Sequence, residues 1–329
     1  MSLTDRCSAT AGSQDAFVER QTSRAEVGLR IELAHGGTAD VALRYELIGR
    51  HGAPLLLVAG GISAGRHVVA SEDLPEPGWW QVQAGSFDLS RFRLLAFDWI
   101  GADGRIDLPI DPADQAEAVR QLVDYLGLDR LAGFIGASYG AMVGMHFAAA
   151  HPQRCGALLA ISAAGAAHPY ASACRSLQRR ALDLGNPAAG VALARAMAML
   201  TYRTPNEFAD RFAVPPNVVA GRVRVGADTY LDVQGERHAS RMSPTAYRRL
   251  SESIDLHRID PAKLAVPLTL VAVDSDALVP PADVAAFASA IPSATFWPIA
   301  SHYGHDAFLK EEAAVAEILA TFLSSLESA

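Results

Sequence analysis

Residues 131–152, LAGFIGASYGAMVGMHFAAAHP, constrain the fold more than any other part of the sequence. An apolar segment typical of a buried strand leads into residues 136–140 (GASYG), and an apolar segment typical of a helix follows. So abrupt a turn requires small residues two before and two after its centre, and Gly136 and Gly140 meet that requirement. The pattern predicts a strand that turns sharply into a helix, with Ser138 raised above the sheet.

Short apolar runs that end in glycine, aspartate or serine recur along the chain and are typical of strands buried on both faces of a parallel sheet. They are residues 55–58, 94–97, 131–135, 157–161 and 268–273. Helix-like segments lie between them, and this alternation predicts an α/β fold with a mostly parallel, doubly wound sheet. Before them, residues 27–48 contain two alternating segments around the turn HGGTAD, which predict an antiparallel strand pair.

The domain organisation follows from where this alternation stops. We expect one α/β core, formed by residues 27–167 and 263–329. Residues 168–262 are rich in arginine and alanine and carry no strong strand signal, so they are predicted to form a helical lid over the carboxyl edge of the sheet. Residues 1–26 are polar and of mixed charge, lack the apolar core of a signal peptide, and are predicted to be a flexible leader.

Charge and composition argue against several classes of partner. The 28 Lys and Arg against 36 Asp and Glu give a net charge of −8, which disfavours binding to nucleic acid or to an anionic membrane. A helix that spans a membrane needs about 20 consecutive apolar residues, and no stretch of the sequence approaches that length. Cys7, Cys155 and Cys174 match neither a disulfide framework nor a metal pair, so we expect no metal site and a cytoplasmic location.

A serine at such a turn suggests nucleophilic catalysis on the α/β-hydrolase fold, in which the chain order is serine, acid, histidine. Asp274 and Asp276 both follow the last predicted buried strand, where a carboxylate can orient an imidazole. We favour Asp276, while the other aspartate would cap the next helix. Of the two histidines near the C-terminus we favour His305 as the base, with His302 as the alternative. The predicted catalytic triad is therefore Ser138, Asp276 and His305.

An oxyanion hole needs backbone N–H groups that point at the reacting oxygen. We expect one from Tyr139, directly after the serine, and another from the loop after the first buried strand, where Gly60 or Gly61 allows close approach. The sequence does not decide between the two glycines, and the loop is alternatively a tight turn only.

Several segments, in order, resemble the MetX-type homoserine O-acyltransferase family. They are GWW (78–80), GASYGAM (136–142), ARAMAMLTYRT (194–204), YLDVQGERHASR (230–241), AYRRLSESIDLH (246–257), SDALVPP (275–281) and YGHDAFL (303–309). The resemblance implies that an acyl group passes from acyl-CoA to the serine and then to the hydroxyl of L-homoserine, in methionine biosynthesis. It also implies acyl-CoA as a co-substrate with no permanently bound cofactor, and a homodimer formed through the lid helices.

The resemblance further implies that Arg195, Tyr202 and Asp306 contact the amino-acid substrate. A carboxylate is suited to a guanidinium group, and an ammonium group to a carboxylate. The alternatives are a solvated lid arginine, a core tyrosine and a helix-capping aspartate. Trp79 and Trp80 are expected to pack against the lid.

Departures from the family pattern bear on the acyl group. Ala137 and Tyr139 replace the family's usual glycine and methionine, and the loop after the strand at residues 94–97 is short. These features resemble a subgroup that transfers succinyl groups, so succinyl is favoured over acetyl. A succinyl carboxylate would then need a cation such as Arg66 or Arg105. The alternatives are a serine O-acyltransferase, an esterase or thioesterase that uses water, and a binding protein without catalysis.

Overall fold

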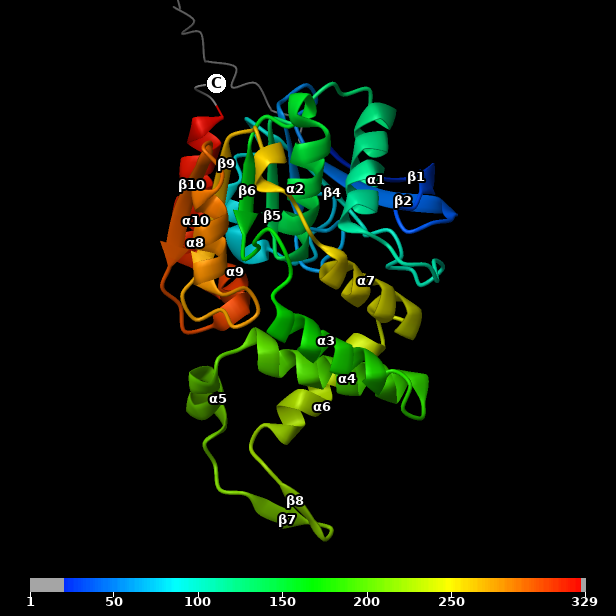
Figure 1. Ribbon diagram of the computed structural model, residues 1–329, viewed down its shortest axis with the longest axis vertical. Helices are drawn as coiled ribbons and strands as arrows, with labels where there is room; N and C mark the ends of the chain where they lie inside the picture. Colours follow the sequence, from blue (N-terminus) through cyan, green and yellow to red (C-terminus); the bar gives the residue numbers. More distant parts are fainter. Residues whose placement is uncertain (1–20, 327–329) are drawn as a thin grey trace, which may run out of the picture.

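The computed structural model describes residues 21–326, which form an eight-stranded sheet with a group of helices at one end (Figure 1). The strands are β1 (Gln21–Glu32), β2 (Thr38–Gly49), β3 (Leu55–Ala59), β4 (Arg93–Phe97), β5 (Gly133–Ala137), β6 (Leu158–Ile161), β9 (Leu268–Val273) and β10 (Ala294–Ile299). Their order across the sheet is β1-β2-β4-β3-β5-β6-β9-β10. All pairs from β4 to β10 are parallel, so the predicted mostly parallel sheet is confirmed.

The antiparallel part of the sheet begins earlier than the sequence suggests. β1 pairs with β2 along its whole length, from Gln21 opposite Gly49 to Glu32 opposite Thr38. The predicted leader, residues 1–26, is therefore too long: residues 21–26 are polar but form a strand, because backbone hydrogen bonds to β2 hold them in the sheet. Residues 1–20 lie outside the described residues.

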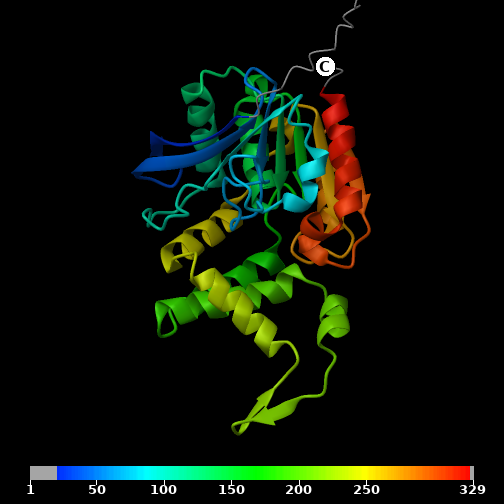
Figure 2. The same ribbon diagram turned by 180° about the vertical axis from the view of Figure 1, so that it is seen from behind.

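Helices cover both faces of the parallel strands. On one face lie α1 (Pro112–Tyr125), α2 (Tyr139–Ala150) and α8 (Pro281–Ser289), and on the other lie the 3₁₀ helix η1 (Gln81–Ser86), α9 (Ala307–Lys310) and α10 (Glu312–Ser325) (Figures 1 and 2). Each face has its own buried apolar cluster. This arrangement explains the unbroken apolar runs of β3, β5 and β6, whose residues are all buried.

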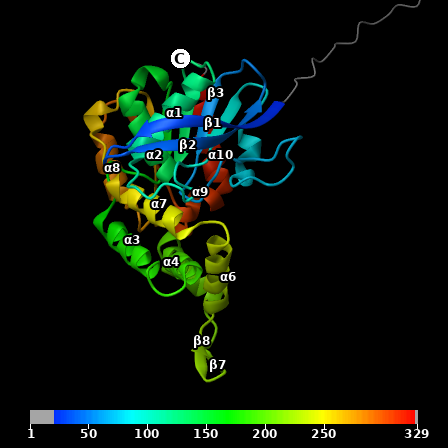
Figure 3. The same ribbon diagram turned by 90° about the vertical axis from the view of Figure 1, so that its right-hand side faces the viewer.

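The lid joins β6 to β9 and lies beyond the carboxyl ends of the parallel strands (Figures 1 and 3). It contains α3 (Pro169–Ala181), α4 (Pro187–Tyr202), α5 (Pro205–Phe212), α6 (Asp228–Ala239) and α7 (Pro244–Leu256). Four of these helices start with proline after a capping side chain, as at Asn186, Thr204 and Ser243. These starts explain why the segment folds as several short helices.

An exposed hairpin within the lid, formed by β7 (Asn217–Val219) and β8 (Arg222–Arg224), was not predicted from the sequence. Two three-residue strands are too short to show a reliable periodicity. The remaining short elements are η2 (Pro152–Arg154), η3 (Pro261–Lys263) and η4 (Gly304–Asp306). Within residues 21–326, no helix is long and apolar enough to cross a membrane.

Candidate active site

Ser138 occupies a strained position between β5 and α2. Its φ of 54° lies in the left-handed region that side-chain-bearing residues rarely adopt. A Cβ atom on Gly136 would lie 2.5 Å from the backbone of residues 140 and 141, and one on Gly140 would lie 2.1 Å from the carbonyl oxygen of Ala59. Only glycine fits at either place, so the turn requires the GxSxG pattern for steric reasons.

The three predicted triad side chains form one hydrogen-bonded chain. The Ser138 Oγ lies 2.8 Å from His305 Nε2, and His305 Nδ1 lies 2.7 Å from Asp276 Oδ2. The other Asp276 oxygen accepts hydrogen bonds from the backbone N–H groups of Leu278 and Val279, at 2.8 and 3.0 Å. Since the carboxylate only accepts, His305 donates from Nδ1 and its Nε2 can accept the serine proton.

The structure places the two alternative residues elsewhere. Asp274 accepts a hydrogen bond from the backbone of Ser301 at 3.0 Å, so it ties the end of β9 to the loop after β10. His302 is partly exposed and lies 3.2 Å from Asp210 in the lid. Neither is hydrogen bonded to Ser138 or His305, and of the two aspartates only Asp276 has the position of a triad acid.

The surroundings of His305 adjust its basicity. Burial disfavours the charged imidazolium, but the charge and hydrogen bond of Asp276, together with the charge of Asp306, outweigh it and raise the pKa of His305 above its ordinary value. Arg175 acts in the opposite direction. A buried base with a raised pKa is suited to taking a proton from a hydroxyl group.

A cavity of about 290 Å³ opens above Ser138 and His305. Arg195, Tyr202 and Asp306, the three predicted substrate contacts, all line it. The Tyr202 ring lies against His305, with centroids 6.0 Å apart, and the Arg195 guanidinium lies 5.3 Å from the Tyr202 centroid. Seven residues are two helical turns, so α4 presents both side chains to the same cavity.

Arg203, which the sequence reasoning did not single out, also lines this cavity. Its Nε lies 2.9 Å from Asp306 Oδ2, and it also forms an ion pair with Glu207. Burial raises the pKa of Asp306, while Arg203, His305 and Arg195 counteract this rise. Arg203 directly follows Tyr202 in a motif already noted, and this adjacency was the only available signal.

The loop after β3 borders the cavity through Gly61 and Ile62. The Gly60 carbonyl instead accepts a hydrogen bond from Gly140 N–H at 2.9 Å, which fixes the loop to the start of α2. Tyr139 is the first residue of α2, and its N–H is one of those without a partner within the helix. Of the two candidate glycines, Gly61 therefore lies at the cavity and Gly60 does not line it.

Several aromatic side chains pack next to the site. The fully buried Tyr139 ring packs edge-on against Trp99, and its hydroxyl lies 2.6 Å from Ser253 Oγ in α7. Trp80 does not pack against the lid as expected: it is fully buried in the core, and its Nε1 donates to the carbonyl of Phe308 at 2.8 Å. Trp79 stacks on Trp80 and lines the cavity.

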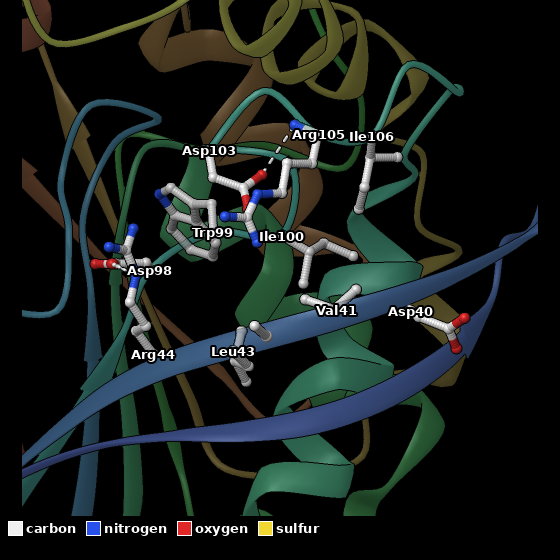
Figure 4. Close-up of a pocket in the computed structure, with 12 residues that line it drawn as sticks. Asp40, Val41, Leu43, Arg44, Asp98, Trp99, Ile100, Asp103, Arg105 and Ile106 are labelled. Carbon is white, nitrogen blue, oxygen red and sulfur yellow. Dashed lines mark hydrogen bonds and ion pairs between the residues drawn. The ribbon is translucent and has the colours of Figure 1, made fainter.

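Neither cation suggested for a succinyl carboxylate lines the cavity around Ser138. Arg66 forms an ion pair with Asp98. Arg105 is exposed and lies beside Asp103 in a separate small pocket against β2, as Figure 4 shows. The structure does not bring these two residues to the cavity, because the short loop after β4 carries Arg105 outward, while Asp98 holds Arg66.

Known proteins are similar to this chain over most of its length. Residues 54–312 match the model of a family described as alpha/beta hydrolase fold. A homoserine O-succinyltransferase of Xanthomonas campestris pv. campestris is 51% identical over 91% of this chain and 84% of its own length. A homoserine O-acetyltransferase of Thermus thermophilus is 30% identical over 88% of this chain and 87% of its own.

Solved structures show the same fold. The crystal structure of a homoserine O-acetyltransferase from Staphylococcus aureus superposes with a TM-score of 0.80, at 23% identity, over 92% of this chain and 95% of that one. Sequence similarity over nearly the whole length, and not the fold alone, decides the family. This chain belongs to the MetX-type homoserine O-acyltransferase family of the α/β-hydrolase fold.

Proposed function

We propose that this chain moves an acyl group, succinyl in preference to acetyl, from acyl-CoA to the hydroxyl of L-homoserine, in methionine biosynthesis. One observation carries the proposal: the cavity that contains Ser138 and His305 also contains a cation, Arg195, and an anion, Asp306. An α-amino acid needs a partner for its carboxylate and another for its ammonium group, whereas water needs neither. The identity of 51% to a homoserine O-succinyltransferase supports the same reading.

The first half-reaction forms an acyl-enzyme. His305 Nε2 takes the Ser138 proton as Oγ attacks the thioester carbonyl carbon, and Asp276 stabilises the imidazolium. The oxyanion is held by Tyr139 N–H and by the loop that contains Gly61. Collapse breaks the carbon–sulfur bond, and CoA leaves as the thiol with the proton from His305.

The second half-reaction transfers the acyl group to the amino acid. Arg195 binds the homoserine carboxylate and Asp306 its ammonium group, which directs the hydroxyl towards the ester carbon. His305 takes the hydroxyl proton as the homoserine oxygen attacks, then returns a proton to Ser138 as the ester to the enzyme breaks. Tyr202, against His305, helps to exclude water from the acyl-enzyme.

The charges in the cavity favour succinyl over acetyl. The lining contains Arg175, Arg195 and Arg203 against the carboxylate Asp306, and Arg203 is already paired with Asp306 and Glu207, which leaves Arg175 and Arg195 for the carboxylates of the substrates. An acetyl group needs no cation, whereas a succinyl group carries a second carboxylate beside that of homoserine. Arg175, whose Nη2 also lies 2.7 Å from Asp255, is the partner proposed for that carboxylate in place of Arg66 and Arg105, which do not line the cavity.

The lid surface supports a homodimer. A groove between α4 and α6 is lined mainly by alanine and leucine side chains. Large apolar side chains are exposed on these helices and on the hairpin: Leu193, Leu200, Val218, Val219, Val223 and Val233. Such a surface is suited to a second copy of the same lid.

Sedimentation of the unmodified protein should give twice the mass of the chain. The substitution Leu193→Asp should shift the measured mass towards that of the monomer.

The cytoplasmic location stays a prediction. It is supported by Cys155 and Cys174, which are both free thiols, as expected in a reducing compartment. Acyl-CoA is proposed as a co-substrate that binds and leaves in each cycle, and no residue is assigned to a resident cofactor.

Thiol release from succinyl-CoA and acetyl-CoA, with homoserine, serine or water as acceptor, tests the proposal. We expect release to be fastest with succinyl-CoA plus homoserine. Double-reciprocal plots of the initial rate against the succinyl-CoA concentration, at several fixed homoserine concentrations, should be parallel, as for a ping-pong cycle. Equal release without an amino acid would support the esterase or thioesterase alternative. Equal use of serine would support the serine O-acyltransferase alternative, because one methylene group contributes only about 1–3 kcal/mol to discrimination.

A further inference from the structure

A second chamber, of about 320 Å³, adjoins the cavity that contains the triad. Both are bordered by Ile62, Ser63, Ala64, Arg195 and Gln234, so these residues form a shared wall. The far side of the chamber is formed by the carboxyl end of α6 and the turn after it, through Arg237, His238 and Arg241. A ligand could therefore extend from Ser138 past Arg195 to the surface of the lid.

Positive charge gathers in this chamber although the whole chain carries −8. Arg44, Arg195, Arg237 and Arg241 line it, against the single carboxylate Asp98. Asp98 is already engaged by Arg44 at 3.1 Å, visible in Figure 4, and by Arg66 outside the chamber. Among residues 21–326, no carboxylate lies within ion-pair distance of the other three lining arginines, so their charges repel one another unless an anion is present.

His238 provides an independent sign that these arginines face one space. It lies on α6 with its ring packed edge-on against Tyr247. Burial, together with the charges of Arg195 and Arg241, lowers the pKa of His238 to about 4. The histidine is therefore neutral near pH 7, and the guanidinium groups supply the positive charge.

We propose that this chamber binds the phosphate groups of the nucleotide end of acyl-CoA, with Arg237 and Arg241 as the main contacts. This inference rests on the proposed acyl-CoA-dependent function. The donor carries its thioester at one end and several phosphate charges at the other, and the thioester must reach Ser138. Guanidinium groups bind phosphate oxygens in pairs, and both arginines are exposed to an entering ligand. Arg195, on the shared wall, separates the phosphate contacts from the acceptor site.

The test compares two donors that share the same acyl group. Succinyl-CoA carries the phosphates, and the succinyl thioester of N-acetylcysteamine does not. In the double variant Arg237→Gln/Arg241→Gln, the ratio of kcat/KM for succinyl-CoA to kcat/KM for the short thioester should fall about 10- to 100-fold. Most of that loss should be in the KM for succinyl-CoA. Inhibition by adenosine 3′,5′-bisphosphate should weaken by a similar factor.

The matched control is Arg248→Gln, which removes a lid arginine that pairs with Asp183 and lines neither chamber. It should leave the ratio between the two donors unchanged. An unchanged ratio in the double variant would overturn the proposal. So would a loss seen with succinyl donors of both kinds but not with acetyl-CoA, since the arginines would then bind the acyl carboxylate.

Failure of the proposed function has a different signature. If the chain does not use acyl-CoA, the unmodified protein would neither release thiol from succinyl-CoA nor bind adenosine 3′,5′-bisphosphate in calorimetry. If it uses acyl-CoA but the phosphates bind elsewhere, the unmodified protein would bind the bisphosphate and the double variant would bind it equally well. The second result overturns the phosphate site alone.

Discussion

The core and the lid contribute to one cavity but hold their side chains by different means. In the core, backbone N–H groups fix Asp276, a hydrogen bond fixes His305, and steric exclusion fixes Ser138. In the lid, Tyr202 and Arg195 are held by ring contacts, and the corner after α4 reaches the core through a few polar contacts. The difference suggests that the core triad determines whether acyl transfer occurs, and that the lid, together with Asp306 where the core meets Arg203, determines which acceptor receives the group.

The largest effect should come from Ser138→Ala, which removes the nucleophile. We expect kcat for thiol release to fall about 10⁴- to 10⁶-fold, with homoserine and with water alike. The matched control is Ser162→Ala, since Ser162 has the same φ of 54° as Ser138 but is buried and does not line the cavity. If the Ser138→Ala protein kept its activity, Ser138 would not be the nucleophile and the mechanism proposed for the core would be wrong.

Asp276→Asn should lower kcat/KM about 10³- to 10⁴-fold and also change the pH profile. The base must be neutral, so activity rises with pH through the pKa of His305, which Asp276 raises above the ordinary value of about 6.5. Without that carboxylate, burial still lowers the pKa, and the acid limb should move to lower pH. The measurement is kcat/KM for the acyl donor against pH.

Asp274→Asn is the control for this shift, because Asp274 bonds to the Ser301 backbone and not to His305. Its acid limb should stay where it is in the unmodified protein. A shift of equal size in both variants would mean that the effect is a general change of charge and not the loss of the triad contact.

Asp306→Asn should separate acceptor binding from the chemistry of the triad most clearly, because Asp306 lies in the core but pairs with Arg203 of the lid. Losing a charged partner for the ammonium group costs about 1.5–3 kcal/mol, so kcat/KM for homoserine should fall about 10- to 100-fold. Slow hydrolysis of the acyl-enzyme by water should fall much less. Asp210→Asn, an exposed lid aspartate that pairs with His302, is the control. Equal losses of transfer and hydrolysis in Asp306→Asn would contradict an acceptor role.

The smallest effect should come from Thr204→Val, which loosens the lid. Thr204 Oγ1 donates to the His302 carbonyl at 2.7 Å, near the loop that carries His305. The hydroxyl also accepts a hydrogen bond from Glu207 N–H as the cap of α5, so losing both contacts costs about 1–2 kcal/mol. The ratio of transfer to hydrolysis should fall about 3- to 10-fold as water enters more easily. Thr201→Val, whose hydroxyl bonds only within α4 to Ala198, should leave that ratio closer to normal. Equal ratios in the two variants would argue against this contact as a water seal.

The sheet and the serine turn could be predicted because their causes are local. Strands buried on both faces must be apolar throughout, and β3, β5 and β6 carry that pattern. The turn needs glycine at residues 136 and 140 for steric reasons alone. Local sequence also predicted that residues 168–262 are helical, but not where the single helices begin and end. The strand formed by residues 21–26 was missed because pairing with β2 holds it in the sheet, and not its own composition.

Only the tertiary structure separated Asp276 from Asp274 and His305 from His302. Each pair has nearly the same local sequence context, and the choice depends on which side chain the packing of β9, β10 and the final helices turns towards Ser138. For the same reason Arg203 in the triad cavity and Arg237 and Arg241 in the second chamber escaped prediction. Sequence patterns report the preferences of neighbouring residues, whereas a site is formed by side chains that are far apart in the chain and meet only once the fold is complete.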